Sequence, residues 1–288
     1  MIKFLKTLSL YGLLFLSYMG VMYGYNKLDL IDAFGTDSNT LILGDSHLQK
    51  ALDPKYFYKA RNISQTSEPY VITFLKLKRF FNRHPKVDTV LLGFSYNNLS
   101  SYNDYKLSNS RWSHEMFKRY YSLIKYPELS KMVPVDYHGL IKTKFKELCL
   151  FPHFKENWEG DYTNFEYSNV KNAERQIRIH FFHNKKQADI SKVSLKYLDS
   201  IVNFTIKNRI KLFLVSTPLH PSYLKRVPKE FKNAFLKEKS KLAKRGIITL
   251  DYSQMQYDDS LFLDSHHLNE YGSSRFSLQL SNDLKNLQ

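Results

Sequence analysis

The hydrophobic pattern of this 288-residue chain begins with one long apolar run. Thr7–Tyr25, TLSLYGLLFLSYMGVMYGY, carries no charge and follows Lys3 and Lys6. About 20 apolar residues span the hydrocarbon core of a bilayer, and a cleaved signal peptide has a shorter core. We therefore expect a transmembrane signal anchor at residues 7–25. The two lysines predict that residues 1–6 are cytoplasmic and that the remainder lies outside, in the periplasm or the extracellular space.

After a polar tether, expected at residues 26–39, short apolar runs alternate with amphipathic stretches. The apolar runs predict strands at residues 40–43, 58–65, 87–95, 210–220 and 247–253. The amphipathic stretches predict helices at residues 68–84, 194–209 and 223–246, and a last helix after Leu268. Strands that alternate with helices indicate a three-layer α/β/α sandwich with a parallel sheet.

The alternation lapses between about residues 100 and 188, where Tyr, Phe, Trp and His are frequent. We expect an inserted subdomain here, within one domain that spans residues 40–288. It would serve as a lid or a substrate platform, and an insert without any ligand role is equally open.

The charge balance favours anionic partners. Lys and Arg outnumber Asp and Glu by 43 to 27, which gives a formal net charge of +16. Lipid head groups, acidic polymers and nucleic acid all fit such a charge. The sequence has neither zinc-finger spacing nor an aromatic ribonucleoprotein motif, so we expect no nucleic-acid partner. A single cysteine, Cys149, excludes an internal disulfide and is interpreted as a small apolar core residue.

Candidate chemistry appears where the first apolar run ends, in LILGDSHLQK, Leu41–Lys50. Ligands bind at the carboxyl ends of the strands in an open α/β sheet, and Ser46 falls at such an end. A serine nucleophile needs a base within about 3 Å and an acid that orients the base. Asp264 and His267, in LFLDSHHLNEYG, supply both types of group at a spacing of three residues. That spacing selects His267 rather than the adjacent His266.

The combination of GDSH at residues 44–47 with DSHH at residues 264–267 resembles the SGNH/GDSL hydrolase superfamily. The resemblance covers about residues 40–288 and is interrupted by the aromatic segment. It implies a flavodoxin-like α/β/α sandwich without a cofactor. It also implies Ser46 as the nucleophile, His267 as the base and Asp264 as the orienting acid.

The resemblance further implies three donors for an oxyanion hole. The first is the backbone amide of Ser46. The second block, ARNISQTSEP, lacks the glycine of the family, so an amide of Ser64 or Gln65 would have to replace it. In the third block, LLGFSYNNLS, Asn97 is the expected donor.

Other residues receive structural interpretations. Asp45 is expected to cap a turn. His180 and His183 have metal-like spacing but no carboxylate or cysteine close by, so no metal site is expected. The glycosylation sequons at Asn62, Asn98 and Asn203 are taken as chance.

Three hypotheses follow for the function. The first is a membrane-anchored serine esterase that removes O-acyl groups, such as acetyl, from a surface glycan. The second is an acyltransferase of the same fold that passes the acyl group to a cell-surface polysaccharide beside a membrane-embedded acyl carrier. The third is a non-catalytic glycan-binding or scaffold domain.

Overall fold

The computed structural model describes residues 1–32, 38–121, 123–124, 129–130, 133–146, 149, 158–170, 173–183 and 185–287. The chain divides into two compact units. The first contains residues 1–36 and 107–158, and the second contains residues 37–106 and 159–288. The aromatic segment expected at residues 100–188 is thereby divided, because residues 159–188 belong to the second unit. Several of its residues, among them 150–157, lie outside the described residues.

The first unit contains three helices with described bounds, α1 (Ile2–Asp32), α4 (Ser110–Tyr120) and α6 (Tyr137–Phe145). Residues Ile2–Tyr25 of α1 are long and apolar enough to cross a membrane, and none of that stretch is buried. It is compatible with a single-pass anchor or with a signal sequence. The helix continues to Asp32, so the first residues of the expected tether are helical rather than extended. Residues 33–37 of that tether lie outside the described residues.

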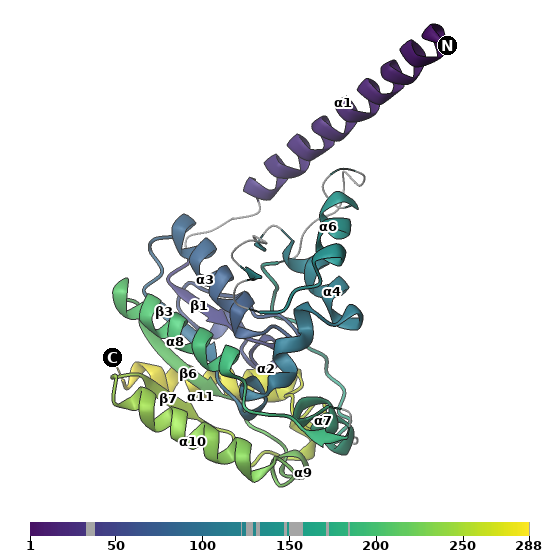
Figure 1. Ribbon diagram of the computed structural model, residues 1–288. Helices are drawn as coiled ribbons and strands as arrows, with labels where there is room; N and C mark the ends of the chain where they lie inside the picture. The colour runs from purple at the N-terminus through teal and green to yellow at the C-terminus, as the bar shows by residue number, and fades with distance from the viewer. Residues whose placement is uncertain are drawn as a thin grey trace. The chain divides into compact units, whose positions relative to one another are not determined.

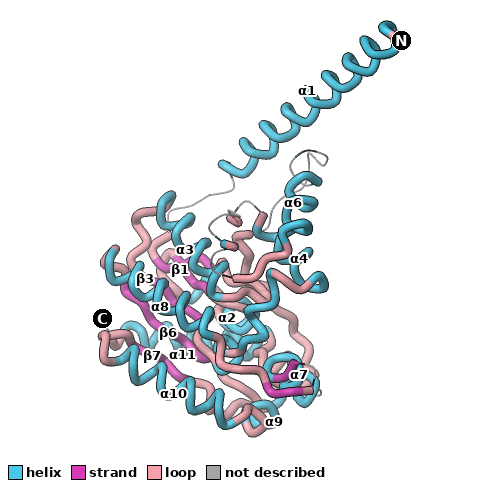
Figure 2. Tube along the Cα trace, in the orientation of Figure 1, coloured by secondary structure: helices cyan, strands magenta, loops and turns pink. Residues whose placement is uncertain are grey.

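The second unit is built on a parallel sheet of five strands, which confirms the fold class expected from the alternating pattern. The order across the sheet is β2-β1-β3-β6-β7. The strands are β1 (Thr40–Leu43), β2 (Ala60–Asn62), β3 (Thr89–Gly93), β6 (Lys211–Ser216) and β7 (Ile248–Asp251). Figure 2 shows these strands at the centre of the unit with helices around them. A separate two-stranded hairpin joins β4 (Phe182–His183) and β5 (Lys186–Gln187).

The helices of this unit lie around the sheet, with α7 and α9 beyond one end of its strands (Figure 1). They are α2 (Ser46–Ala51), α3 (Tyr70–Arg83), α7 (Ala173–Phe181), α8 (Lys192–Lys207), α9 (Pro221–Leu224), α10 (Lys229–Ala243) and α11 (Glu270–Lys285). Four 3-10 turns complete the described elements: η1 (Pro54–Tyr56), η2 (Tyr96–Leu99), η3 (Ser101–Leu107) and η5 (Asp259–Leu261).

One apolar layer joins the sheet to α2 and α11. Ile42, Leu91 and Phe213 are register partners on adjacent strands, so their side chains share one face. This face packs in one cluster with Leu48 of α2 and Phe276 of α11. Helices α3 and α8 pack against each other on the opposite face. Because strands buried on both faces need apolar residues at every position, β1 and β3 read as continuous apolar runs.

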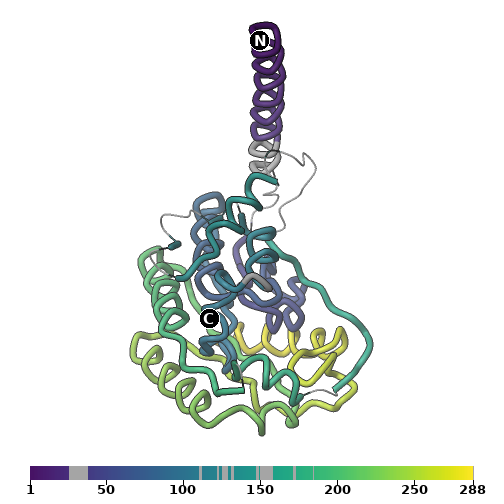
Figure 3. The backbone as a smooth tube through the Cα atoms, turned by 45° about the vertical axis from the view of Figure 1, so that its right-hand side comes forward, coloured from purple at the N-terminus to yellow at the C-terminus, as the bar shows by residue number. Residues whose placement is uncertain are grey.

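The strand order places a topological switch between β1 and β3. The chain moves from β1 to β2 in one direction and then returns to β3 on the other side of β1. Ligands bind at such a switch in open α/β sheets, outside the carboxyl ends of the strands. Figure 3 shows α11 beside the segment that follows β1. The Ser273 and Ser277 hydroxyls of α11 both donate to the Ala51 carbonyl at 3.1 Å, so the end of the chain is fixed to α2.

Candidate active site

Ser46 lies at the topological switch, as the first residue of α2 directly after β1. Gly44 turns the chain there with a φ of 154°. A Cβ at Gly44 would lie 3.3 Å from backbone atoms of Gly93, at the end of β3, so the two strands approach closely. Asp45 caps α2 by accepting the backbone N–H of His47 at 3.0 Å. The role expected for Asp45 in a turn is therefore confirmed, and the cap fixes the orientation of Ser46.

The structure brings the three residues of the expected triad together. Nε2 of His267 lies 2.8 Å from Oγ of Ser46, and Nδ1 of the same ring lies 2.8 Å from Oδ2 of Asp264. Because a carboxylate only accepts hydrogen bonds, Nδ1 carries the proton in the neutral ring and Nε2 is left to accept the Ser46 proton. The chain separation of 221 residues between Ser46 and His267 is bridged by the packing of α11 on α2.

A tight loop between η5 and α11 holds the acid and the base. Oδ1 of Asp264 accepts the backbone N–H groups of His266 and His267, each at 2.9 Å. The Leu263 amide donates to the His267 carbonyl at 2.9 Å and closes the loop. Asn269 then caps α11 by accepting the Gly272 amide at 3.0 Å. These bonds fix the carboxylate independently of the imidazole that it orients.

Burial keeps the His267 imidazole neutral. It lowers the pKa of His267 to about 3, with the neighbouring His266 acting in the same direction and Asp264 opposing both. For Asp264, burial alone would raise the pKa, but the attraction of His267 outweighs it and holds the pKa well below the usual value. At pH 7 the pair is thus a carboxylate and a neutral imidazole, the states that a general base requires.

A second buried carboxylate lies beside the triad. Oδ1 of Asp45 accepts Nδ1–H of His47 at 3.0 Å, and Oδ2 accepts the side-chain amides of Asn97 and Asn98, each at 2.9 Å. Burial by itself would raise the pKa of Asp45. The charge of His47 and the hydrogen bonds outweigh burial and hold the pKa well below its usual value. Asp45 thereby ties the turn after β1 to η2 after β3. The sequence around Asp45 predicts a local cap only and gives no sign of this link.

The backbone amides of Ser64 and Gln65, expected as oxyanion donors, are engaged elsewhere. The backbone N–H of Ser64 donates to Oδ1 of Asn62 at 3.0 Å, and that of Gln65 donates to the Gly44 carbonyl at 3.0 Å. Neither amide is therefore open to a substrate oxygen, which corrects that expectation. Asn97 uses one of its two Nδ2 hydrogens on Asp45. The Ser46 amide, in the first turn of α2, has no helical acceptor and is the donor that the helix geometry leaves open.

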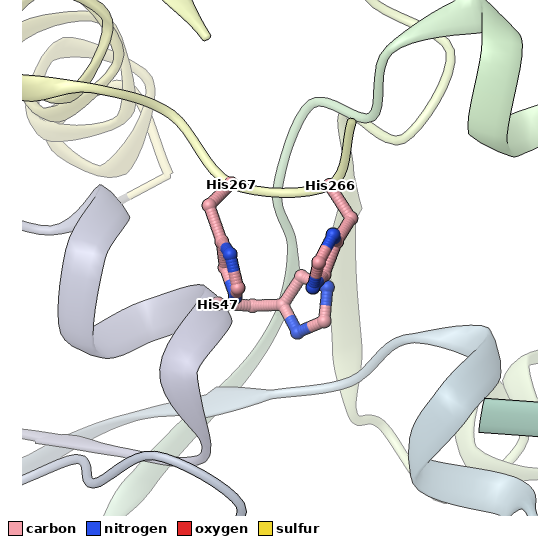
Figure 4. A group of neighbouring side chains, drawn as sticks. All are labelled: His47, His266 and His267. Atoms are coloured by element: carbon pink, nitrogen blue, oxygen red, sulfur yellow. The ribbon is translucent and has the colours of Figure 1, made fainter. Parts of the chain in front are cut away.

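His180 and His183, the pair with metal-like spacing, have separate partners. Nδ1 of His180 lies 2.7 Å from the Tyr223 hydroxyl, while the ring of His183 stacks on Tyr105 with centroids 5.5 Å apart. Among the described residues, the one group with metal-ligating geometry is a different one, formed by His47, His266 and His267. Figure 4 shows His266 and His267 on one loop with His47 facing them from α2. Sequence spacing gave no sign that His47 joins the other two.

His266 has surroundings unlike those of His267. Its ring stacks on Tyr223, with centroids 5.4 Å apart, and meets His180 edge-on at 5.1 Å. Burial lowers the pKa of His266, although Asp264 partly opposes this. It is His267, as the spacing predicted, whose ring hydrogen-bonds to Ser46.

Two of the three sequons are incompatible with a glycan in this fold. Asn62 and Asn98 are buried, and both side-chain amides donate hydrogen bonds inside the protein. Asn203 is exposed on α8.

Residues 161–169 run alongside α2 and the loop of Asp264. Asn164 donates to the Lys50 carbonyl of α2 at 2.6 Å, and the Asn169 amide donates to the Leu263 carbonyl at 2.9 Å. Two aromatic side chains of this segment, Phe165 and Tyr167, are 50% and 62% exposed. The segment thus presents exposed aromatic rings close to the elements that carry the triad.

A basic pocket lies between α7 and α9. It has a volume of about 400 Å³. Its lining includes three arginines, Arg175, Arg178 and Arg226. Glu174 and Ser222 also line it. Helices α7 and α9 also provide His180 and Tyr223, which contact His266 beside the triad.

No protein-family model and no curated protein matches the chain. Solved structures with a similar arrangement include a GDSL-like lipase from Bacteroides thetaiotaomicron, at 9% identity and a TM-score of 0.47 over 93% of this chain and 100% of the other. A protein from Streptococcus pneumonia, provisionally named a platelet activating factor, matches at 12% identity and a TM-score of 0.45 over 97% and 98% of the two chains. A protein from Bacteroides fragilis, provisionally named an acylhydrolase, matches at 11% identity and 0.43 over 88% and 90%. Likeness of this degree assigns no activity to the present chain.

Proposed function

We propose that this chain is a serine ester hydrolase in which Ser46 is the nucleophile, His267 the general base and Asp264 the orienting acid. The observation that carries the proposal is the continuous line of hydrogen bonds from Ser46 through His267 to Asp264, with both contacts at 2.8 Å. A serine, a base and an acid in this arrangement define a nucleophilic triad irrespective of their order in the chain.

The reaction begins when Nε2 of His267 takes the proton of Ser46 and Oγ forms a bond to the ester carbonyl carbon. The carbonyl oxygen becomes an oxyanion, which the Ser46 amide at the start of α2 stabilises. The ester C–O bond then breaks as the imidazolium returns its proton to the leaving alcohol. Water, deprotonated by His267, attacks the acyl-enzyme and releases the acid together with free Ser46. Asp264 stays ionised and stabilises the imidazolium in both steps.

The substrate proposed is an O-acylated glycan, with acetyl as the acyl group. Exposed aromatic rings stack on the apolar faces of sugars, and Phe165 and Tyr167 offer such rings beside α2. The pocket of Arg175, Arg178 and Arg226 suits a carboxylate or phosphate on the same polymer, because arginine binds such groups through paired N–H donors. The net charge of +16 favours an acidic polymer as well.

The location proposed is the outer side of a membrane. Residues Ile2–Tyr25 would be the anchor, with Lys3 and Lys6 on the cytoplasmic side. In this arrangement the second unit faces the polymers of the cell envelope, and O-acylated glycans among them are the proposed substrates.

The experiment is intact-mass analysis of the full-length chain in detergent after exposure to a fluorophosphonate. We expect one phosphonyl adduct on the wild type and none on Ser46→Ala. The Ser64→Ala variant is the matched control, because it removes another buried hydroxyl from the same edge of the sheet and is expected to keep the adduct. If folded wild-type protein forms no adduct, the enzyme proposal is wrong and a binding or scaffold domain is the better description.

Hydrolysis and transfer share the acyl-enzyme and differ in what removes the acyl group. Incubation with an acetyl ester and an acidic oligosaccharide separates them. Release of free acetate alone supports the hydrolase, whereas acetylated oligosaccharide would identify an acyltransferase, for which a membrane-embedded carrier would supply the acyl group.

A further inference from the structure

Three buried imidazoles converge beside Ser46 and leave two nitrogens without a hydrogen-bond partner. His47, His266 and His267 each offer one ligand atom, and these atoms all lie within 4.8 Å of one another (Figure 4). Nε2 of His47 and Nδ1 of His266 are buried and form no hydrogen bond in the described part of the chain. Nδ1 of His266 lies 2.9 Å from Oδ1 of Asp264, but outside hydrogen-bonding geometry. Buried polar atoms without partners are rare and call for a ligand such as an ion or water.

We propose that His47, His266 and His267 form a binding site for a divalent zinc-type metal ion, and that its occupation switches off Ser46. Imidazole nitrogen is a preferred ligand of zinc, and three histidines with one further ligand make a typical tetrahedral zinc site. Metal binding does not require the proposed function. The inhibitory effect does rest on it, because it presumes that His267 is the base of Ser46.

The outer partners of the histidines match those of metal sites. Metal-ligating histidines commonly donate their second N–H to a carboxylate, which fixes the ring and increases its basicity. His47 donates Nδ1–H to Asp45 at 3.0 Å, and His267 donates Nδ1–H to Asp264 at 2.8 Å. In both rings Nε2 therefore carries the free electron pair that a metal needs. The two carboxylates also balance the charge of a divalent cation.

The geometry requires a modest rearrangement of the rings. Zinc–nitrogen bonds of about 2.0–2.1 Å place the nitrogens of a tetrahedral site about 3.3 Å apart. The ring centroid of His47 lies 5.1 Å from that of His267 and 5.4 Å from that of His266, whereas the centroids of His266 and His267 are 3.9 Å apart and have to separate. Small side-chain rotations bring three nitrogens that now lie within 4.8 Å to that separation.

Occupation of this site and activation of Ser46 exclude each other. The electron pair of Nε2 in His267 accepts the Ser46 hydroxyl in the described structure. An ion bound to the same electron pair displaces that hydroxyl, and no proton has to leave because the ring is already neutral. The Ser46 hydroxyl is then without a base. Metal release restores the hydrogen bond and the nucleophile.

The binding test uses the full-length chain in detergent, without a polyhistidine tag and freed of metal by a chelator. Calorimetric titration with zinc chloride is expected to show one ion per chain, and cobalt(II) is expected to give the visible absorption of a tetrahedral complex. His47→Gln and His266→Gln should each weaken binding at least about tenfold, the smallest loss typical of a change in an outer partner. His180→Gln is the matched control, since this half-buried histidine bonds to Tyr223 instead, and Cys149→Ser tests whether the thiol contributes.

The wild type also allows a test that needs no variant. Zinc should shift the ring-nitrogen NMR signals of three histidines and leave the other seven unchanged, out of ten in the chain. Binding that both glutamine variants retain, or shifts confined to other histidines, would overturn the site.

Fluorophosphonate labelling separates the inhibitory effect from the binding. Zinc-loaded protein should not be labelled at Ser46, and EDTA should restore labelling. If one zinc binds but labelling continues, the inhibitory role is wrong. If metal-free protein is never labelled while one zinc still binds to the three histidines, the esterase proposal fails and the metal site stands.

Discussion

Asp264 holds His267 at two points, through the ring Nδ1 at 2.8 Å and through the backbone N–H at 2.9 Å. The carboxylate therefore fixes both the ring and the loop from which it extends. This double contact sets the tautomer of His267 and directs Nε2 at Ser46. Asp45 holds His47 in the same way at a spacing of two residues, through the ring Nδ1 and the backbone N–H, each at 3.0 Å.

Substitutions in the triad should remove activity without unfolding the protein. Ser46→Ala and His267→Gln are each expected to lower kcat on p-nitrophenyl acetate by about 10⁴-fold or more. Asp264→Asn should lower it by about 10⁴-fold, because the amide favours the wrong tautomer of His267. Steady-state kinetics measure the losses, and circular dichroism checks the fold. A double variant that loses little more than either single variant would show that the residues act as one unit.

The acid limb of the pH–rate profile should lie at unusually low pH. His267 must be neutral to accept the Ser46 proton, and burial lowers its pKa from the usual value of about 6.5. Activity is therefore present above the lowered pKa and is lost only as the pH falls through it. We expect kcat/KM, measured with EDTA present, to stay nearly constant from pH 7 down through pH 6. A midpoint at 6.5 or above would contradict a desolvated His267.

Recovery of activity at pH 7 after acid exposure is the control for that profile. It distinguishes protonation of the base, which reverses at once, from acid unfolding.

Gly44→Ala should disturb the site through the backbone. The new Cβ would lie 3.3 Å from Cα and N of Gly93, which cannot move away as a side-chain end does, and φ at Gly44 is unfavourable for alanine. We expect a loss of about 1–3 kcal/mol in the free energy of unfolding, together with reduced kcat/KM. Urea unfolding and ester hydrolysis measure the two effects.

Gly246→Ala is the matched control for backbone strain. Its φ is also positive, at 78°, but nothing lies within 4 Å of the new Cβ. It should lose stability and keep kcat/KM per folded molecule. If Gly44→Ala behaves in the same way, close approach of β1 and β3 does not position Ser46.

The basic pocket should distinguish anionic from neutral substrates. Arg178→Ala and Arg226→Ala are each expected to raise KM for an acidic O-acetylated oligosaccharide by about tenfold, the value of one charge-assisted hydrogen bond. Hydrolysis of p-nitrophenyl acetate should be unchanged. Lys237→Ala, an exposed change on α10, is the control for total charge. Equal effects of all three variants would indicate general charge attraction rather than a subsite.

Local patterns were sufficient for the elements and for naming Ser46, Asp264 and His267 as residues that would meet. The apolar run before Gly44, the spacing of Asp264 and His267, and the alternation around them each reflect a short-range physical requirement: a strand buried on both faces, an acid within reach of a ring, and a helix that packs on a sheet. The expected strands and helices around the site correspond to elements of the structure. Their ends differ by a few residues because capping and turn contacts decide where an element stops.

The oxyanion donors were not predictable in the same way. Whether the amides of Ser64 and Gln65 are open depends on what else they bond, and both bond within the turns that follow β1 and β2. One of the two Nδ2 hydrogens of Asn97 donates to Asp45. A motif names residue types in order, but it does not record which hydrogen bonds are already formed.

The sequence by itself determined that a serine at a strand end and an acid–histidine pair before a last helix would belong to one α/β sandwich, because the alternation of strands and helices follows from periodicity. Only the tertiary structure decided that His47 turns to Asp45 and stands 5.1 Å from His267, ring to ring. The physical reason is that this contact joins elements 220 residues apart, across an apolar layer whose packing no local pattern specifies.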